Sequence, residues 1–102
     1  MQEAVDPEEA LVAAASSCHM LWFLAHAAKR GFVVDSYVDE ANGFIAADQA
    51  GRHAFTRITL HPLVAFSGDQ PTEAEVAALH EEAHDSCFIA NSLRCEITVA
   101  VA

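Results

Sequence analysis

Basic residues are scarce in this chain of 102 residues, which has 5 Lys and Arg against 15 Asp and Glu and a formal net charge of −10 at pH 7. Such an acidic surface repels a phosphate backbone, which excludes nucleic acid as an expected partner. Glycine and proline are also rare, at 4 and 3 residues, while 53% of the residues are hydrophobic. This composition excludes a disordered chain and predicts one globular domain over residues 1–102. So much apolar surface on a short chain also predicts a homo-oligomer.

Cysteine is limited to Cys18, Cys87 and Cys95, which lie at wide and irregular spacing. An odd and irregular set excludes the disulfide framework of a small secreted domain, and it leaves at least one thiol free. We therefore expect a reducing environment and a cytoplasmic protein.

The chain also lacks an uninterrupted membrane span. Residues 11–28 are largely apolar but include Ser16, Ser17, His19 and His26. The preceding residues 2–9 are acidic, whereas a secretory signal begins with basic residues. The sequence predicts a buried helix here, with no targeting segment and no membrane partner.

Asp6-Pro7 predicts the start of a helix, because an N-cap residue is followed by proline, which suits the first helical position. The helix is predicted to end at Lys29, just before Arg30-Gly31. It is apolar nearly all round, which is typical of a central helix. One side is shared by Leu11, Ala14, Ala15, Cys18, Leu21, Trp22 and Ala25.

In the rest of the chain, apart from one helix, apolar and polar residues alternate with the period of two that is typical of strands. Residues 32–47 and the return run to Phe66 form a predicted long hairpin around the turn 48–51, and Pro62 within it indicates an edge or a bulge. Thr72 and Glu75 have capping-box spacing, which predicts a helix to about Asp85. A final strand is predicted over 93–101. The order helix, two strands, helix, strand (α-β-β-α-β) is that of an α+β fold.

Three histidine and cysteine features have structural explanations. His80-Glu81-Glu82-Ala83-His84 fits the H-E-x-x-H zinc motif, and Cys87 could complete a ligand set, but we favour solvated or second-shell histidines and expect no bound metal. Cys95 lies on the inward side of the predicted last strand and is expected to be structural. His19 is expected to be a buried histidine with a hydrogen-bond partner.

Cys18 and Cys87 allow two interpretations. They can be buried thiols on the core sides of two helices, since cysteine is often buried as a small hydrophobic residue. They can also be chemically active, because a thiol near unpaired backbone N–H groups at a helix end can be held as a thiolate. Their flanking residues favour the second interpretation.

Two segments carry a family resemblance that covers nearly the whole chain. Residues 4–20, AVDPEEALVAAASSCHM, and residues 83–92, AHDSCFIANS, contain two long cysteine motifs in order and at the right separation. The chain thereby resembles the OsmC/Ohr family of thiol-dependent peroxidases. The similarity is greatest to the OsmC-like branch, in which Phe-Ile-Ala-Asn-Ser follows the second cysteine.

The resemblance implies a fold and an activity. The fold is an OsmC-like α+β domain with a long central helix packed on a curved antiparallel sheet, in an intertwined homodimer. The activity is reduction of organic or inorganic hydroperoxides, with Cys18 as the peroxidatic thiol and Cys87 as the resolving thiol. An external dithiol restores the pair, and no cofactor is expected. Apolar walls at Leu21, Trp22, Phe23 and Phe88 would suit a lipophilic peroxide.

Glu8 matches the active-site glutamate of the family. It precedes Cys18 by ten residues, which on a straight helix is about 15 Å. Glu8 must therefore act on a neighbouring subunit, or the helix must break between the two residues. We predict a break near residues 10–13.

The chain departs from the family at its start, where only five residues precede Asp6. Family members carry N-terminal strands in this region, with an arginine that keeps the thiol ionised. None of Arg30, Arg52, Arg57 and Arg94 matches that motif. Without a nearby cation the pKa of the thiol is expected to be raised, and turnover is expected to be weak. The alternative function is therefore a non-catalytic dimeric module of the same fold, which binds a hydrophobic ligand or serves as a scaffold.

Overall fold

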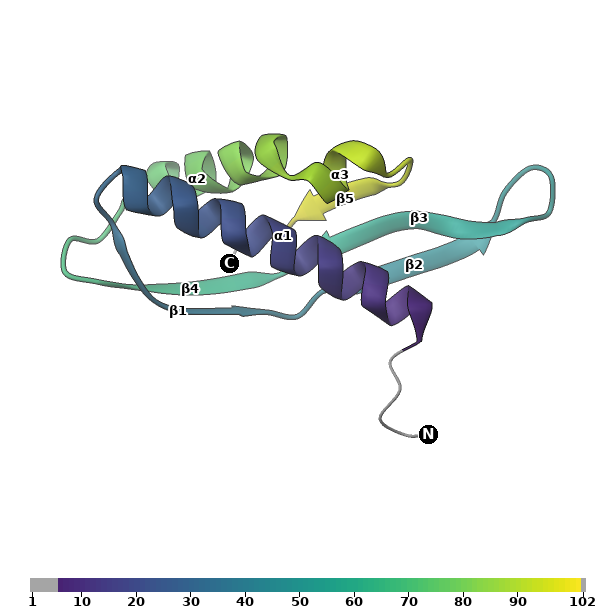
Figure 1. Ribbon diagram of the computed structural model, residues 1–102, viewed down its shortest axis with the longest axis horizontal. Helices are drawn as coiled ribbons and strands as arrows, with labels where there is room; N and C mark the ends of the chain where they lie inside the picture. Colours follow the sequence, from purple (N-terminus) through teal and green to yellow (C-terminus); the bar gives the residue numbers. More distant parts are fainter. Residues whose placement is uncertain (1–5, 102) are drawn as a thin grey trace.

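The computed structural model describes residues 6–101. Its elements follow the predicted order, except that each of the two predicted hairpin strands is divided into two and a short helix precedes the last strand. They are α1 (Pro7–Lys29), β1 (Val33–Asp39), β2 (Asn42–Ala47), β3 (His53–Leu60), β4 (Pro62–Ser67), α2 (Glu73–Ser86), α3 (Phe88–Ser92) and β5 (Glu96–Val99). The helices α1 and α2 lie side by side, and the strands run beneath them as long ribbons (Figure 1). The arrangement confirms a mixed α+β fold.

Helix α1 begins and ends where its sequence signals place it. The side chain of Asp6 accepts a hydrogen bond from the backbone N–H of Glu9 at 2.7 Å, and Pro7 occupies the first helical position. Gly31 follows the helix with φ of 80°, a conformation that costs glycine little. The helix is continuous from Pro7 to Lys29. The predicted break near residues 10–13 is therefore wrong, since Ala-Leu-Val-Ala contains no glycine or proline to interrupt a helix.

The predicted hairpin is present, but it is divided in the middle into two sheets. Strand β1 pairs with β4, and β2 pairs with β3, both antiparallel. The division falls at residues 40–41 and at His61, whose backbone N–H donates to Asp39 Oδ1 at 2.6 Å. Pro62 is the first residue of β4, a position that tolerates the missing N–H. The proline thus marks the irregularity that the sequence indicates.

The last strand differs from its prediction in length and in pairing. It covers Glu96–Val99 instead of residues 93–101 and pairs parallel to β3, which gives the sheet order β2-β3-β5. A parallel neighbour requires a crossover, and α2 and α3 supply it. The sheet is therefore mixed and not purely antiparallel. Cys95 lies just outside the strand and packs, half-buried, against the core, in keeping with a structural thiol.

The core lies beneath α1 in two clusters, one toward each sheet. The first is centred on Ala15, Ile58, Leu60 and Ile97, and the second on Phe23, Ala27, Leu79 and Ala83. The buried side of α1 consists of Ala15, His19, Phe23 and Ala27, spaced by four residues. This differs from the predicted side, because Leu21 is 62% exposed. A helix that is apolar nearly all round gives no periodic signal to select the buried side.

Helix α1 is long and apolar enough to cross a membrane by length and composition alone. A core helix of a soluble protein passes the same test. Here α1 packs along α2 and contacts β1, β2 and α3. These contacts make α1 the central helix of the fold, but only 22% of its apolar 18-residue window is buried within one chain, so the predicted burial is only partly observed.

Candidate active site

Cys18 and Cys87 meet in the folded chain although 69 positions separate them in the sequence. The two side chains lie close enough for each thiol to shift the pKa of the other, and both residues are free thiols. Cys18 is half-buried, and Cys87 is 1% exposed. The structure thus brings together the two cysteines that the sequence singles out.

The junction between α2 and α3 places Cys87. Cys87 ends α2 and caps α3, with an extended backbone at φ −69° and ψ 114°. Its Sγ accepts a hydrogen bond from the backbone N–H of Ala90 at 3.4 Å, the role that a serine oxygen usually fills at an N-cap. Asn91 Nδ2 donates to the carbonyl of Asp85 at 3.0 Å across the junction. Sequence reasoning missed α3, and the cap at Cys87 is the signal that could have identified it.

The surroundings of the two thiols shift their pKa values in opposite directions. Burial alone would raise the pKa of Cys18, but hydrogen bonds from the Cys87 thiol and from the backbone N–H groups of Ile89 and Phe88 outweigh it, so the pKa of Cys18 is lowered. Burial raises the pKa of Cys87, as does its hydrogen bond to Cys18. The expectation that the pKa of Cys18 is raised without a cation is therefore wrong. The Cys87 side chain and the backbone donors together stabilise the thiolate.

Aromatic and aliphatic side chains surround the pair. The rings of Trp22 and Phe88 meet edge to face with centroids 5.7 Å apart. Phe88 is 70% exposed, and Leu21, from the next turn of α1, is 62% exposed. The prediction that Phe23 also forms these walls is wrong, because Phe23 is fully buried in the second core cluster. The thiols thus lie beside apolar surface that solvent can reach.

Glu8 lies apart from the thiols, exposed in the first turn of α1. Because the helix is unbroken, about 15 Å along its axis separate Glu8 from Cys18. Glu8 lines instead an open cleft of about 500 Å³ between the start of α1 and the strands. The other lining residues are Glu9, Val12, Ala13, Ser16, Ser17, Asp39, Ala41, Asn42, Gly43, Ile45 and Phe55.

Two histidines, His19 and His80, form a buried pair that the sequence analysis did not predict. His19 Nε2 and His80 Nδ1 are 2.9 Å apart, with the rings stacked at 5.2 Å. His19 is 2% exposed and His80 is 3% exposed, so His19 is buried with a partner as expected, whereas the solvated assignment is wrong for His80. Among residues 6–101, no group of three or more His, Cys, Asp or Glu side chains could hold a metal ion.

Arg30, Arg52 and Arg57 have partners other than the thiols. Arg30 forms an ion pair with Glu82, and Arg52 Nε lies 3.9 Å from Asp48. The guanidinium of Arg57 lies 4.3 Å from the centre of the Phe44 ring. Within the part of the chain that the structure describes, no arginine hydrogen-bonds to Cys18 or Cys87.

Comparisons with known proteins agree in fold. The sequence model of the family described as OsmC-like protein matches residues 1–102 of the chain. An OsmC-like protein of unknown function from Vibrio cholerae is 45% identical, with a TM-score of 0.96 over 100% of this chain and 67% of that chain. No curated protein matches the chain.

Two solved structures of lower identity show the same fold. The organic hydroperoxide resistance protein OsmC from Legionella pneumophila is 19% identical, with a TM-score of 0.79 over 98% of this chain and 71% of that one. The organic hydroperoxide resistance protein OhrB of Bacillus subtilis is 17% identical, with a TM-score of 0.80 over 99% of this chain and 73% of its own.

Proposed function

Because the chain belongs to the OsmC-like family, we propose that it reduces organic or inorganic hydroperoxides with Cys18 as the attacking thiol and Cys87 as the resolving thiol. The observation that carries the proposal is that the fold brings the two thiols together, with the pKa of Cys18 lowered and that of Cys87 raised. This asymmetry gives the reaction an order. The half-buried sulfur that is more easily ionised attacks first, and its protonated neighbour follows.

The chemistry balances with an external dithiol as the reductant. The Cys18 thiolate attacks one oxygen of the hydroperoxide, so that an S–O bond forms, the O–O bond breaks, and the leaving alkoxide takes a proton to become an alcohol. The sulfur of Cys87 then attacks the sulfenic acid of Cys18. An S–S bond forms, the S–O bond breaks, and water leaves. Two thiol–disulfide exchanges with the dithiol restore both thiols.

The test is hydroperoxide consumption by the purified protein with dithiothreitol as reductant. We expect turnover of cumene hydroperoxide to exceed that of hydrogen peroxide, because Leu21, Trp22 and Phe88 offer apolar surface at the thiols. Mass spectrometry after one equivalent of hydroperoxide should find the Cys18–Cys87 disulfide, with Cys95 still reduced. Free Cys18 and Cys87 after exposure to both peroxides would refute the proposal.

A second function is favoured by the open cleft at the start of α1. Its volume of about 500 Å³ and its apolar side chains Val12, Ile45 and Phe55 would suit a non-catalytic module that binds a hydrophobic ligand. That function predicts binding of an apolar fluorescent probe with both thiols left unoxidised by peroxide. Peroxide consumption that depends on Cys18 decides against it.

We propose further that two copies form a homodimer and that Glu8 of one copy acts at Cys18 of the other. Leu21, Val38, Leu63 and Phe88 are each at least 58% exposed, which leaves apolar surface for a second copy to cover. Within one chain the unbroken α1 keeps Glu8 about 15 Å from Cys18 along the helix axis. A glutamate supplied by a partner removes this difficulty.

Complementation tests this arrangement. Glu8→Gln is expected to slow peroxide consumption at least tenfold, on the scale of a lost acid–base group. When Glu8→Gln and Cys18→Ser chains are mixed and allowed to exchange, each mixed dimer holds one site with an intact Glu8 and Cys18, so activity should return. The control is Glu9→Gln, which removes the neighbouring exposed carboxylate and should leave the rate unchanged. No recovery in mixed dimers of confirmed mass would rule out action across the dimer.

We propose the cytoplasm as the location, supported by the three free thiols. Alkylation of intact cells before lysis should find all three cysteines reduced in unstressed cells. A stable Cys18–Cys87 disulfide in resting cells would contradict a reducing compartment.

A further inference from the structure

One side of α1 faces the end of α2 and the start of α3 with every fourth residue. This spacing places the residues in line along one side of a helix. Cys18 lies close to Cys87, and Trp22 meets the ring of Phe88. The next two positions in the line are His26 and Arg30, the residue just after α1. The thiol contact is therefore the first in a row of contacts between this side of α1 and the region where α2 ends and α3 begins.

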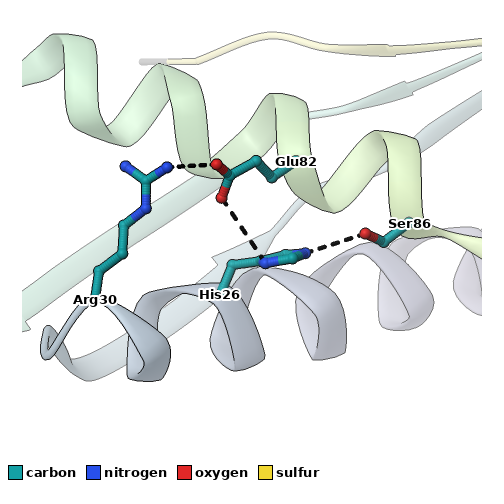
Figure 2. A network of polar contacts seen from close by, with 4 residues as sticks. All are labelled: His26, Arg30, Glu82 and Ser86. Atoms are coloured by element: carbon teal, nitrogen blue, oxygen red, sulfur yellow. Dashed lines mark hydrogen bonds and ion pairs between the residues drawn. The ribbon is translucent and has the colours of Figure 1, made fainter.

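The polar part of this row is a network of four side chains (Figure 2). His26 Nε2 lies 3.1 Å from Ser86 Oγ, and His26 Nδ1 lies 3.8 Å from Glu82 Oε1. The other oxygen of Glu82 pairs with Arg30. Trp22 stacks on the His26 ring with centroids 5.9 Å apart. The imidazole is thus held by an aromatic ring and by two polar partners from α2.

Ser86 is the residue directly before Cys87 and the last residue of α2. The regular helix stops there, and the backbone N–H of Cys87 makes only a 3.3 Å hydrogen bond to the carbonyl of His84. The α2 ladder therefore holds Cys87 through this one hydrogen bond, and α3 holds it from the other side through its cap. The contact between Ser86 and His26 adds a side-chain anchor to α1 one residue away. Cys18 and His26 are both on α1, so one rigid helix determines the positions of both sulfurs.

We propose that His26 is a positioning residue that, through Ser86, holds the Cys87 sulfur against Cys18. The use of this geometry in peroxide reduction rests on the proposed function, but the geometry itself can be tested without peroxide. In the catalytic cycle the sulfur of Cys87 attacks the sulfenic acid of Cys18, forming the S–S bond as water leaves. A second hydroperoxide competes for the same sulfenic acid and produces sulfinic acid. A displaced Cys87 loses this competition.

The first experiment measures the disulfide equilibrium of the full chain in mixtures of reduced and oxidised dithiothreitol. In Ser86→Ala the Cys18–Cys87 disulfide should require a ratio of oxidised to reduced reagent about five- to tenfold higher than in the parent, because one positioning hydrogen bond is lost. Ser86→Thr keeps a hydroxyl and should restore the parent value. Ser36→Ala removes an exposed hydroxyl from β1 and should change nothing.

A merely structural role for the network would lower the melting temperature of Ser86→Ala and leave this equilibrium unchanged. That result would overturn the inference, as would a parent protein that never forms the disulfide. Glu82→Gln removes the partner of Arg30 and His26 and should shift the equilibrium in the same direction as Ser86→Ala. Glu81→Gln changes the exposed neighbour on the same helix and is the matched control.

The second experiment separates this inference from the proposed function. After excess cumene hydroperoxide without reductant, Ser86→Ala should accumulate several-fold more Cys18 sulfinic acid than the parent, at an unchanged rate of first oxidation. If the parent forms the disulfide in dithiothreitol mixtures but no hydroperoxide oxidises Cys18, the proposed function fails while the positioning role stands. An equal sulfinic fraction in parent and variant would contradict the positioning role.

Discussion

Replacing Cys18 with serine is expected to abolish hydroperoxide consumption, with a loss of about a thousandfold or more, because the nucleophile of the first step is removed. A serine hydroxyl is far less acidic than the thiol, and the backbone N–H groups of Phe88 and Ile89 are not sufficient to ionise it. The measurement is steady-state consumption of cumene hydroperoxide with dithiothreitol. The control is Cys95→Ser, which should retain the parent rate because Cys95 packs against the core. Equal rates in Cys18→Ser and the parent would exclude the assignment.

The same reasoning predicts a different failure when Cys87 is replaced. Cys87→Ser should retain the first oxidation and lose the disulfide, so that Cys18 proceeds to sulfinic acid and turnover stops. Serine keeps a donor toward the Cys18 sulfur, whereas Cys87→Ala removes it. The pH dependence of Cys18 alkylation should therefore shift to higher pH in Cys87→Ala than in Cys87→Ser, because the donor helps to lower the pKa of Cys18. Coincident profiles would mean that the backbone donors alone control this pKa.

Local sequence signals predict where the helices of this fold begin. The capping box of α2 forms as expected, with the Glu75 N–H donating to Thr72 Oγ1 at 3.1 Å and the Thr72 N–H to Glu75 Oε1 at 2.8 Å. Asp6 and Gly31 likewise mark the two ends of α1. These signals depend on contacts within four residues, which is why a single sequence carries them.

Features that depend on contacts between distant residues could not be predicted from the sequence. Pro62 indicates an irregularity beside His61, but the sequence does not indicate that the hairpin changes sheet there, since Asp39 and His61 are 22 residues apart and meet only after folding. The buried side of α1 was also assigned wrongly, because Leu21 and Phe23 are equally apolar and only packing distinguishes them. The pKa of Cys18 depends on N–H groups of the unpredicted helix α3, so its direction could not be derived from the residues beside it.

The candidate thiols were found through long motifs, and the folded chain explains why two such motifs are needed. Cys18 contributes a sulfur from the middle of α1, and the segment after Cys87 contributes the donors that lower its pKa. Neither segment forms the site alone. His19 lies within the first motif and His80 just before the second. Neither histidine was used in the sequence arguments for the thiols, yet the two rings join the same two helices.

Acidification from pH 7 to pH 4 is expected to reduce the free energy of unfolding by about 3 kcal/mol through His19. Burial lowers the pKa of His19 to about 4 from an ordinary value of 6.5, and the neighbouring His80 and His84 lower it further, against an opposing effect of Asp39. The unfolded chain therefore binds the proton more readily than the folded chain. The stability is fully present above pH 6.5 and is lost as the pH falls toward 4.

Chemical denaturation at a series of pH values measures this effect, and the variant His19→Gln isolates it. Glutamine keeps a hydrogen bond toward His80 without titrating, so the slope of stability between pH 6.5 and pH 4 should be smaller than in the parent. The control is His53→Gln, an exposed histidine at the start of β3, which should keep the parent slope. Parallel curves for the parent and His19→Gln would show that the buried pair is not the acid-sensitive element.

The same pair links acid stability to the thiols. His80 lies seven residues before Cys87 on α2, and His19 follows Cys18 directly on α1. The 2.9 Å contact between His19 Nε2 and His80 Nδ1 therefore holds together the two helices that position the sulfurs. A proton on His80 places a charge beside the buried Phe23 ring, whose centroid is 4.4 Å from that of His80, and burial opposes this charge. Disulfide formation should accordingly weaken at pH values where the histidines become charged, even before the chain unfolds.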